Sequence, residues 1–338
     1  MNADVERLAL DLDRPFGISR GTTGTTENVV VTLERDGAVG RGAAAPSTYY
    51  GETADTVASV LPDLLAAVEA CDDPHAVQQV HERMDRVVAD NPAAKAAVDV
   101  ALFDLRCRLL DVPLFRHLGL DPDRAVPSTF TVSLADPPEM RRRAAAGVEA
   151  GYDRLKVKLG GDDDERALAA VREAAPDAAI RVDANAGWEP HQAVRLCETC
   201  ADHGVEFVEQ PVPPGADERL VRERSPVPVV ADESCPTAAD VPAVADRADG
   251  VNVKLMKCGG VQPALEQIHA ARAHGLSVML GCMLETNLTI AAAAHLTPLV
   301  DYADLDGSLL LADDPYAGVP MPACDLSTVA AGTGARPA

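Results

Sequence analysis

The sequence predicts a parallel β/α barrel preceded by a separate α+β domain. Three observations support this prediction: short β-branched runs recur after residue 128, helical stretches separate them, and successive runs end roughly 22 to 28 residues apart. That spacing is what one strand and its crossover helix need. Eight such units favour a closed barrel over an open doubly wound sheet, which is the main alternative. The runs are, in chain order, STFTVS (128–133), RLKVKLG (154–160), AIRVDAN (179–185), VEFVEQP (205–211), VPVVADE (227–233), GVNVKLM (250–256), LSVMLGC (276–282) and YADLDG (302–307).

The stretches between these runs have helical character. PPEMRRRAAAGVEAG (137–151) and GDDDERALAAVREAAP (161–176) carry acids in the first turn and end at Gly or Pro. Short apolar strands with Ala-rich amphipathic partners are typical of a parallel sheet covered by helices.

The chain before the barrel has a different pattern. Residues 27–46 (ENVVVTLERDGAVGRGAAAP) alternate in polarity around Asp36-Gly37, which predicts a hairpin. Residues 53–118 are mostly helical, and Pro92 lies near the start of one expected helix. These features predict a small α+β domain.

We therefore expect three parts in the chain. Residues 1–122 form the capping domain, residues 123–307 form the barrel, and residues 308–338 return to the capping domain. The last part is rich in Pro and Gly and is too short for a further domain.

Composition excludes several classes of partner. The net charge of −23 is spread along the chain, so phosphates of nucleic acid or of an anionic membrane would be repelled. The first residues lack an apolar segment of a signal peptide, and no stretch is apolar enough for a membrane span. We expect a cytoplasmic protein. Scarce lysine with abundant acid also suggests a surface adapted to high salt.

Eight cysteines occur, including the pair Cys197 and Cys200 in CETC. A second such pair or a His pair at ligand spacing is missing, so reduced thiols are favoured over a zinc or redox site.

Three consecutive strands are expected to end in acids. The carboxyl ends of barrel strands form one face, where polar residues are candidates for catalysis. One acid at such a place is commonly a helix N-cap. Asp183, Glu209 and Asp232 together, however, would repel one another strongly without a cation. Oxygen ligands of this kind predict a Mg²⁺ site, with Mn²⁺ as the alternative.

Lysine is used sparingly, and its placement indicates chemistry. Only Lys95 of five lysines lies outside the strand-end motifs. Lys156 and Lys158 alternate on one strand and face the same side, roughly 7 Å apart. Two charges at that distance repel by about 2 kcal/mol at an effective dielectric near 20, so one amine can serve as a general base. Lys254 lies four strands further round and should stand opposite, as a racemase or epimerase requires. Lys257 is expected on the surface or in a loop.

These motifs together resemble the enolase superfamily, in the mandelate racemase/muconate lactonizing subgroup. The resemblance covers essentially the whole chain and implies a modified TIM barrel, (β/α)7β, with an N-terminal capping domain. It also implies metal binding by Asp183, Glu209 and Asp232. The motifs that carry it are KVK (156–158), VDAN (182–185), VEQP (208–211), ADES (231–234) and VNVKLMKCGG (251–260).

Within this subgroup, GCMLETNLTIAAAAHL (281–296) and DLDGSLLLADDP (304–315) are similar to the dipeptide epimerases, which include L-Ala-D/L-Glu epimerase. That likeness implies 1,1-proton transfer at the α-carbon of the C-terminal residue of a dipeptide through a metal-stabilised enediolate. Lys158 and Lys254 would exchange the proton on opposite faces, and Lys156 would add positive field.

The resemblance also implies substrate contacts. Asp304 and Asp306 would bind the ammonium group of the dipeptide, and Thr131 would touch the substrate. Arg20, in the capping loop, would contact a C-terminal glutamate, although a shift of one residue would place Gly21 there.

Asn185 and Glu233 are expected to hold the metal ligands or the lysines in position. Barrel enzymes of this kind often assemble, so a homo-oligomer is also expected.

Other functions stay open on the same residues. A muconate cycloisomerase or o-succinylbenzoate synthase would share the metal and lysine motifs, but its diacid substrate has no ammonium group for Asp304 and Asp306. N-Acylamino acid racemisation is disfavoured for the same reason. A Schiff-base aldolase would use Lys254 as the nucleophile, and a metal-stabilised binding protein would use no lysine.

Overall fold

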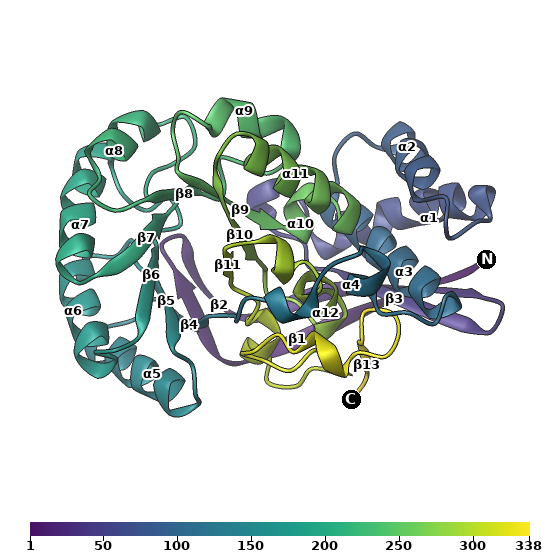
Figure 1. Cartoon of the computed structure of the whole chain (residues 1–338), viewed down its shortest axis with the longest axis horizontal. Helices are drawn as coiled ribbons and strands as arrows, with labels where there is room; N and C mark the ends of the chain where they lie inside the picture. Colours follow the sequence, from purple (N-terminus) through teal and green to yellow (C-terminus); the bar gives the residue numbers. More distant parts are fainter.

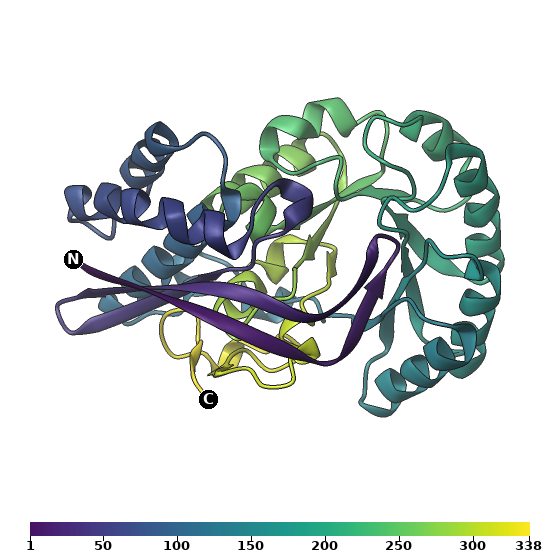
Figure 2. The same ribbon diagram turned by 180° about the vertical axis from the view of Figure 1, so that it is seen from behind.

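The computed structural model describes residues 1–338 and places an antiparallel sheet beside an eight-stranded parallel barrel (Figure 1). The small sheet has the strand order β1 (Asn2–Ile18), β2 (Gly21–Arg35) and β3 (Ala38–Ala44). The predicted hairpin at Asp36-Gly37 joins β2 to β3, and both residues have positive φ as a tight turn requires. The long β1–β2 hairpin was not predicted. Figure 2 shows its tip reaching over the barrel strands.

Helices α1 (Ala54–Cys71), α2 (Val77–Val87), α3 (Pro92–Leu109) and α4 (Leu114–His117) complete the capping lobe. Pro92 occupies the first turn of α3, as predicted. Helix α3 lies directly on β3, since a Cβ at Gly40 would come within 2.3 Å of the carbonyl oxygen of Ala101. The Ala-rich sequence of α3 allows this close approach, and most of the helix is buried.

The second sheet confirms the predicted barrel. Its eight strands follow chain order, every neighbouring pair is parallel, and a bridge between Ser128 and Ala303 joins the two ends. Each predicted run contains one strand. The strands are β4 (Phe130–Val132), β5 (Arg154–Lys158), β6 (Ala179–Asp183), β7 (Val205–Glu209), β8 (Val229–Ala231), β9 (Gly250–Lys254), β10 (Ser277–Gly281) and β11 (Tyr302–Ala303).

Helices cover the outside of the barrel (Figure 1). Outward-facing residues such as Leu155, Val157 and Val182 are fully buried against them. The inward positions between these residues are therefore free to carry polar groups. The helices are α5 (Pro137–Glu149), α6 (Asp164–Ala174), α7 (Pro190–Asp202), α8 (Glu218–Arg224), α9 (Val241–Val244), α10 (Leu255–Cys258), α11 (Val261–Ala273) and α12 (Asn287–Ala294).

The C-terminal segment contacts the capping lobe. It contains the short strands β12 (Tyr316–Ala317) and β13 (Arg336–Pro337). The backbone N–H of Thr333 donates to Asp104 of α3 at 2.8 Å, and Leu114 donates to the carbonyl of Gly332 at 2.9 Å. These contacts lie where the sequence led us to expect them, while the division of the chain at residues 122 and 307 stays a prediction.

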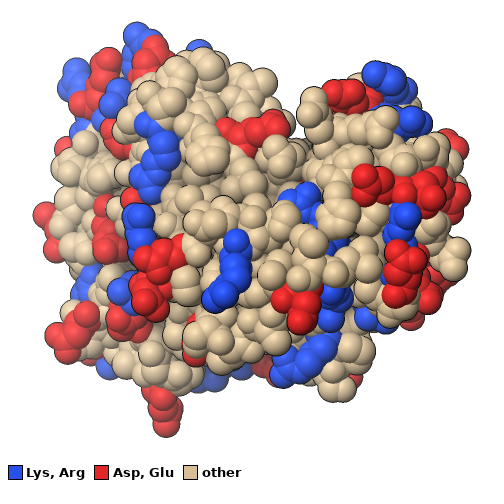
Figure 3. Space-filling view, turned by 45° about the vertical axis from the view of Figure 1, so that its right-hand side comes forward, with Lys and Arg blue, Asp and Glu red and all other residues tan.

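The surface and the cysteines give no sign of a further site. All eight cysteines are free, and Cys197 and Cys200 are buried in α7. No helix has both the length and the apolar character needed to cross a membrane. Figure 3 shows acidic and basic side chains intermixed on one face. Adaptation to high salt thus remains without support.

Candidate active site

A cavity of about 740 Å³ lies between the capping lobe and the carboxyl ends of the barrel strands. The tip of the β1–β2 hairpin and residues 45–54 form its outer wall. The size suits a dipeptide. The predicted site residues that line it are Arg20, Gly21, Thr131, Lys156, Lys158, Asn185, Lys254, Asp304 and Asp306.

The three predicted metal ligands lie beneath the lysines of this cavity. Asp183 and Glu209 end β6 and β7, Asp232 directly follows the adjacent β8, and all three are almost fully buried. Their carboxylates are paired with ammonium groups: Lys158 Nζ lies 2.6 Å from Asp183 and Lys254 Nζ lies 2.7 Å from Asp232. The barrel therefore gathers acids and lysines into one buried charge cluster.

The carboxylates of this cluster differ in acidity. Burial opposes ionisation of Asp183, but the charges of Lys158 and Lys156 outweigh it and hold its pKa below the usual range. Lys254 and Lys257 lower the pKa of Asp232 in the same way. Burial and the charge of Asp183 instead raise the pKa of Glu209 to about 7.

The carboxylate oxygens of Asp183, Glu209 and Asp232 are chemically suited to bind a divalent cation. In the arrangement described, no three acidic, His or Cys side chains converge on one point, because lysine ammonium groups lie between the acids. Glu209 Oε2 is buried without a well-directed donor, although Lys156 Nζ lies 2.8 Å away. Buried carboxylate oxygens on adjacent strands are ligands that Mg²⁺ prefers. These three acids are thus the residues that could hold the ion.

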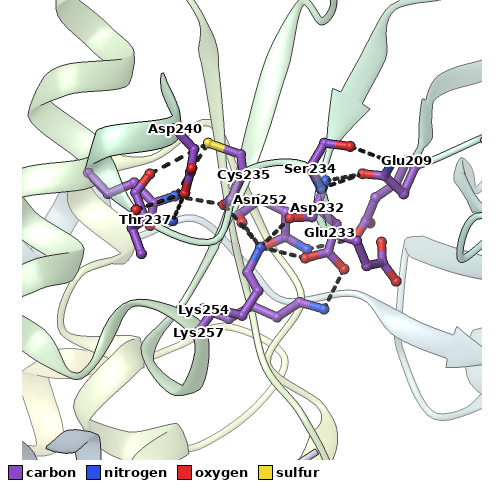
Figure 4. Close-up of polar contacts among 12 residues, drawn as sticks. Glu209, Asp232, Glu233, Ser234, Cys235, Thr237, Asp240, Asn252, Lys254 and Lys257 are labelled. Atoms are coloured by element: carbon purple, nitrogen blue, oxygen red, sulfur yellow. Dashed lines mark hydrogen bonds and ion pairs between the residues drawn. The ribbon is translucent and has the colours of Figure 1, made fainter. Parts of the chain in front are cut away.

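Lys257 is not on the surface, and that expectation was wrong. It is fully buried in α10, the single turn that follows β9 directly, so its side chain turns back into the barrel. Its amine donates to Asp232 Oδ1 at 2.6 Å and to the carbonyls of Asp232 and Asn252 (Figure 4). Lys257 and Lys254 therefore hold Asp232 from two sides.

Lys156 is almost fully buried and lies among three carboxylates. Its amine lies 2.8 Å from Asp304, 2.8 Å from Glu209 and 3.1 Å from Asp183. Burial disfavours the charged amine, but these carboxylates outweigh it and raise its pKa well above the usual value. The repulsion between Lys156 and Lys158 does not neutralise Lys156.

Lys158 and Lys254 lie on opposite sides of the barrel mouth. They end β5 and β9, which are four strands apart in an eight-stranded barrel. Both lysines line the cavity, which is required if they exchange a proton on opposite faces of the substrate α-carbon. Burial disfavours the charged form of Lys254, but Asp232 outweighs it and raises the pKa of this amine.

Asp304 and Asp306 lie on the β11 side of the cavity. Asp304 accepts a hydrogen bond from Lys156 Nζ, so its charge is balanced and its pKa is lowered despite burial. Asp306 accepts from the backbone N–H of Thr131 at 2.6 Å and from its hydroxyl at 3.1 Å. Burial and the charge of Asp304 raise the pKa of Asp306 to about 7. Asp306 is therefore the acid that lacks a cationic partner.

Arg20 is at the tip of the β1–β2 hairpin and enters the site. It donates to Glu233 Oε1 and to the carbonyl of Asn185, each at 2.8 Å. Burial and the charges of Asp232 and Asp183 raise the pKa of Glu233, and the charges of Lys254 and Arg20 oppose that shift. Asn185 positions Asp183 through its backbone N–H, at 2.8 Å, rather than through its side chain.

Sequence reasoning missed three residues near the acids. Asn252 donates to Glu209 Oε1 at 2.7 Å, and Gln210 accepts from the backbone N–H of Asp232 at 2.9 Å. Glu285 follows β10 and is fully buried, and burial raises its pKa to about 7. Asn252 was detectable, since it alternates with Lys254 and so shares its inward face.

Two family models match the chain. Residues 3–119 match the N-terminal domain of the mandelate racemase / muconate lactonizing enzymes, and residues 139–323 match the enolase C-terminal domain-like family. The chain therefore belongs to the mandelate racemase / muconate lactonizing enzyme family, which the fold and the strand-end acids had indicated.

Several similar proteins within this family are dipeptide epimerases. The hydrophobic dipeptide epimerase of Roseobacter litoralis is 39% identical over 331 residues, covering 95% of this chain and 94% of that protein. The L-Ala-D/L-Glu epimerase of Bacteroides thetaiotaomicron is 37% identical, covering 92% of this chain and 81% of that protein. The structure of the dipeptide epimerase of Enterococcus faecalis with Mg and L-Leu-L-Tyr matches with a TM-score of 0.92 and 34% identity, covering 98% of each chain.

Replacement of Lys257 tests its role beneath the site. Lys257→Met leaves one side of the buried Asp232 carboxylate without its cation, so we expect the free energy of unfolding to fall by about 3 kcal/mol or more. Lys95→Met is the matched control, because its partner Asp85 is largely exposed and can be hydrated. Urea denaturation should separate the two variants. Equal stability of Lys257→Met and the unmodified chain would contradict this account.

Proposed function

We propose that this protein is a metal-dependent dipeptide epimerase that moves a proton at the α-carbon of the C-terminal residue of a dipeptide. The observation that carries the proposal is the placement of Lys158 and Lys254 on opposite sides of one cavity. Two amines facing one carbon from both sides can remove a proton on one face and return it on the other. The similarity to dipeptide epimerases supports the same reaction.

Asp183, Glu209 and Asp232 would hold the metal ion. Mg²⁺ is favoured by oxygen ligands, and the Enterococcus faecalis structure contains Mg; Mn²⁺ is the alternative. When bound, the cation would stabilise negative charge that develops on the substrate carboxylate.

The other residues of the site have separate tasks. Lys156 stays charged among three carboxylates and would add positive potential at the substrate carboxylate. Lys158 and Lys254 would each exchange a proton at Nζ. The hairpin tip that carries Arg20 would close the cavity and exclude water.

The β11 side of the cavity favours a substrate with an ammonium group. Lys156 already balances Asp304, whereas Asp306 lacks a cation. An ammonium group bound there would complete the pairing, and Thr131 would hold Asp306 in place. Diacid substrates of a cycloisomerase or of o-succinylbenzoate synthase, and N-acylamino acids, have no such group.

A Schiff-base aldolase is disfavoured because it would use Lys254 as a nucleophile and would give the three buried carboxylates of Asp183, Glu209 and Asp232 no task. Metal-assisted proton transfer uses both the lysines and the acids. Assembly of several copies of this chain stays a prediction.

Isotope exchange tests the proposal directly. Incubation of L,L-dipeptides with the enzyme and Mg²⁺ in D₂O should place deuterium at the α-carbon of the C-terminal residue and produce the L,D isomer. Chelation of the metal should stop the exchange, and Mg²⁺ should restore it.

The same assay tests whether Lys158 and Lys254 are both needed. Lys158→Ala and Lys254→Ala should each lose at least about 1,000-fold in epimerisation, because the proton then lacks a donor or an acceptor on one face. Lys95→Ala controls for loss of a lysine outside the site. A folded enzyme that leaves deuterium out of a broad dipeptide panel would contradict the proposal.

The pH dependence of KM tests Asp306. An ammonium group binds the ionised carboxylate, so protonation of Asp306 below its pKa of about 7 competes with the substrate. At saturating Mg²⁺ we expect KM to rise up to roughly tenfold per pH unit below 7. Asp306→Asn should raise KM at pH 8 and remove this dependence. A pH profile that is the same in both enzymes would assign the titration to another group.

A further inference from the structure

Arg20 is the only arginine that lines the cavity, and it is already paired. One nitrogen of its guanidinium, Nη1, donates both to Glu233 and to the carbonyl of Asn185. The guanidinium carbon lies over the ring of Tyr49, 4.4 Å from the ring centroid. Three separate contacts therefore fix Arg20 in the wall of the cavity.

Glu233, the partner of Arg20, makes no other ion pair, although the charge of Lys254 also favours its ionised form. The Glu233 side chain is 1% exposed, and its bond to Arg20 is the only ion pair that it makes. Its second oxygen, Oε2, is buried without a donor. Leaving a buried carboxylate without its cation costs free energy. Breaking the ion pair between Glu233 and Arg20 is therefore unfavourable. The charge of Arg20 is therefore compensated by that of Glu233 in this part of the wall.

This part of the wall faces the C-terminal residue of a bound dipeptide, on the function proposed above. Asp304 and Asp306 place the ammonium end at β11, whereas Asn185 and Glu233 follow β6 and β8 on the other side of the mouth. The side chain of the C-terminal residue would thus point toward Arg20.

We propose that Glu233 is a specificity-determining residue that neutralises Arg20, so that this enzyme prefers dipeptides with an uncharged C-terminal side chain over those ending in glutamate. The proposal rests on the proposed epimerase function. A side-chain carboxylate would either separate Glu233 from Arg20 or share one guanidinium with a second buried acid. Both outcomes are unfavourable by charge repulsion or by desolvation. An uncharged side chain causes neither and can pack beside Ile18 and Tyr49.

An isosteric substrate pair isolates this effect. L-Ala-L-Gln and L-Ala-L-Glu have nearly the same shape, so the ratio of their kcat/KM values reports the side-chain charge and cancels general effects on catalysis. At saturating Mg²⁺ we expect the unmodified enzyme to favour L-Ala-L-Gln by at least about tenfold. Glu233→Gln keeps a hydrogen-bond acceptor for Arg20 and removes the charge, so it should shift the ratio toward L-Ala-L-Glu by about tenfold or more.

Two further variants complete the test. Glu27→Gln makes the same chemical change at a glutamate that lines the cavity but is exposed and unpaired with Arg20, and it should leave the ratio unchanged. Adding Arg20→Met to Glu233→Gln should cancel the shift of the kcat/KM ratio toward L-Ala-L-Glu, because that shift depends on the positive charge of the unpaired Arg20.

The outcomes separate this proposal from the function on which it rests. A preference of the unmodified enzyme for L-Ala-L-Glu would overturn the specificity role, and this arm does not depend on folding of any variant. If Glu233→Gln changed kcat/KM equally for both dipeptides, Glu233 would have a structural role only, and this result would also overturn the specificity role. Turnover of neither dipeptide nor of a wider panel would instead overturn the epimerase function, and the specificity proposal with it.

Discussion

The pairing of buried carboxylates with buried lysines is the interaction on which the rest of this structure depends. Asp183, Glu209 and Asp232 end adjacent strands in the same mouth, where charge repulsion would be severe without compensation. Lysine amines from β5, β9 and α10 supply that compensation. A divalent cation would supply it as well. The same charge cluster therefore stabilises the carboxyl ends of the barrel strands and provides the residues of the proposed reaction.

The surroundings of this cluster keep each charge in a defined place. Asn252 orients Glu209, Gln210 orients Asp232, and the backbone of Asn185 orients Asp183. Gly281 is required on β10, since a Cβ there would come within 2.6 Å of Asn252 Oδ1. The tip of the β1–β2 hairpin brings the capping lobe into the lining of the cavity. Barrel and capping lobe therefore build one site between them.

Much of this arrangement was predictable because strand geometry is regular. Alternation along a strand placed Lys156 and Lys158 on one face, and the strand count placed Lys254 opposite. The predicted position of Lys257 was wrong because the chain enters α10 directly after β9. A single helical turn is too short to produce a recognisable hydrophobic period in the sequence. The β1–β2 hairpin was missed because most of its outer residues are exposed and polar. Pairings such as Arg20 with Glu233 join residues 213 positions apart, which one sequence cannot reveal.

The central claim is that two amines face one carbon from opposite sides. A crystal structure of the protein with Mg²⁺ and a dipeptide measures this most directly. The account predicts that Lys158 Nζ and Lys254 Nζ lie on opposite faces of the α-carbon of the C-terminal residue, with the cation bound by the three acids. Both amines on one face, or a cation bound elsewhere, would contradict it.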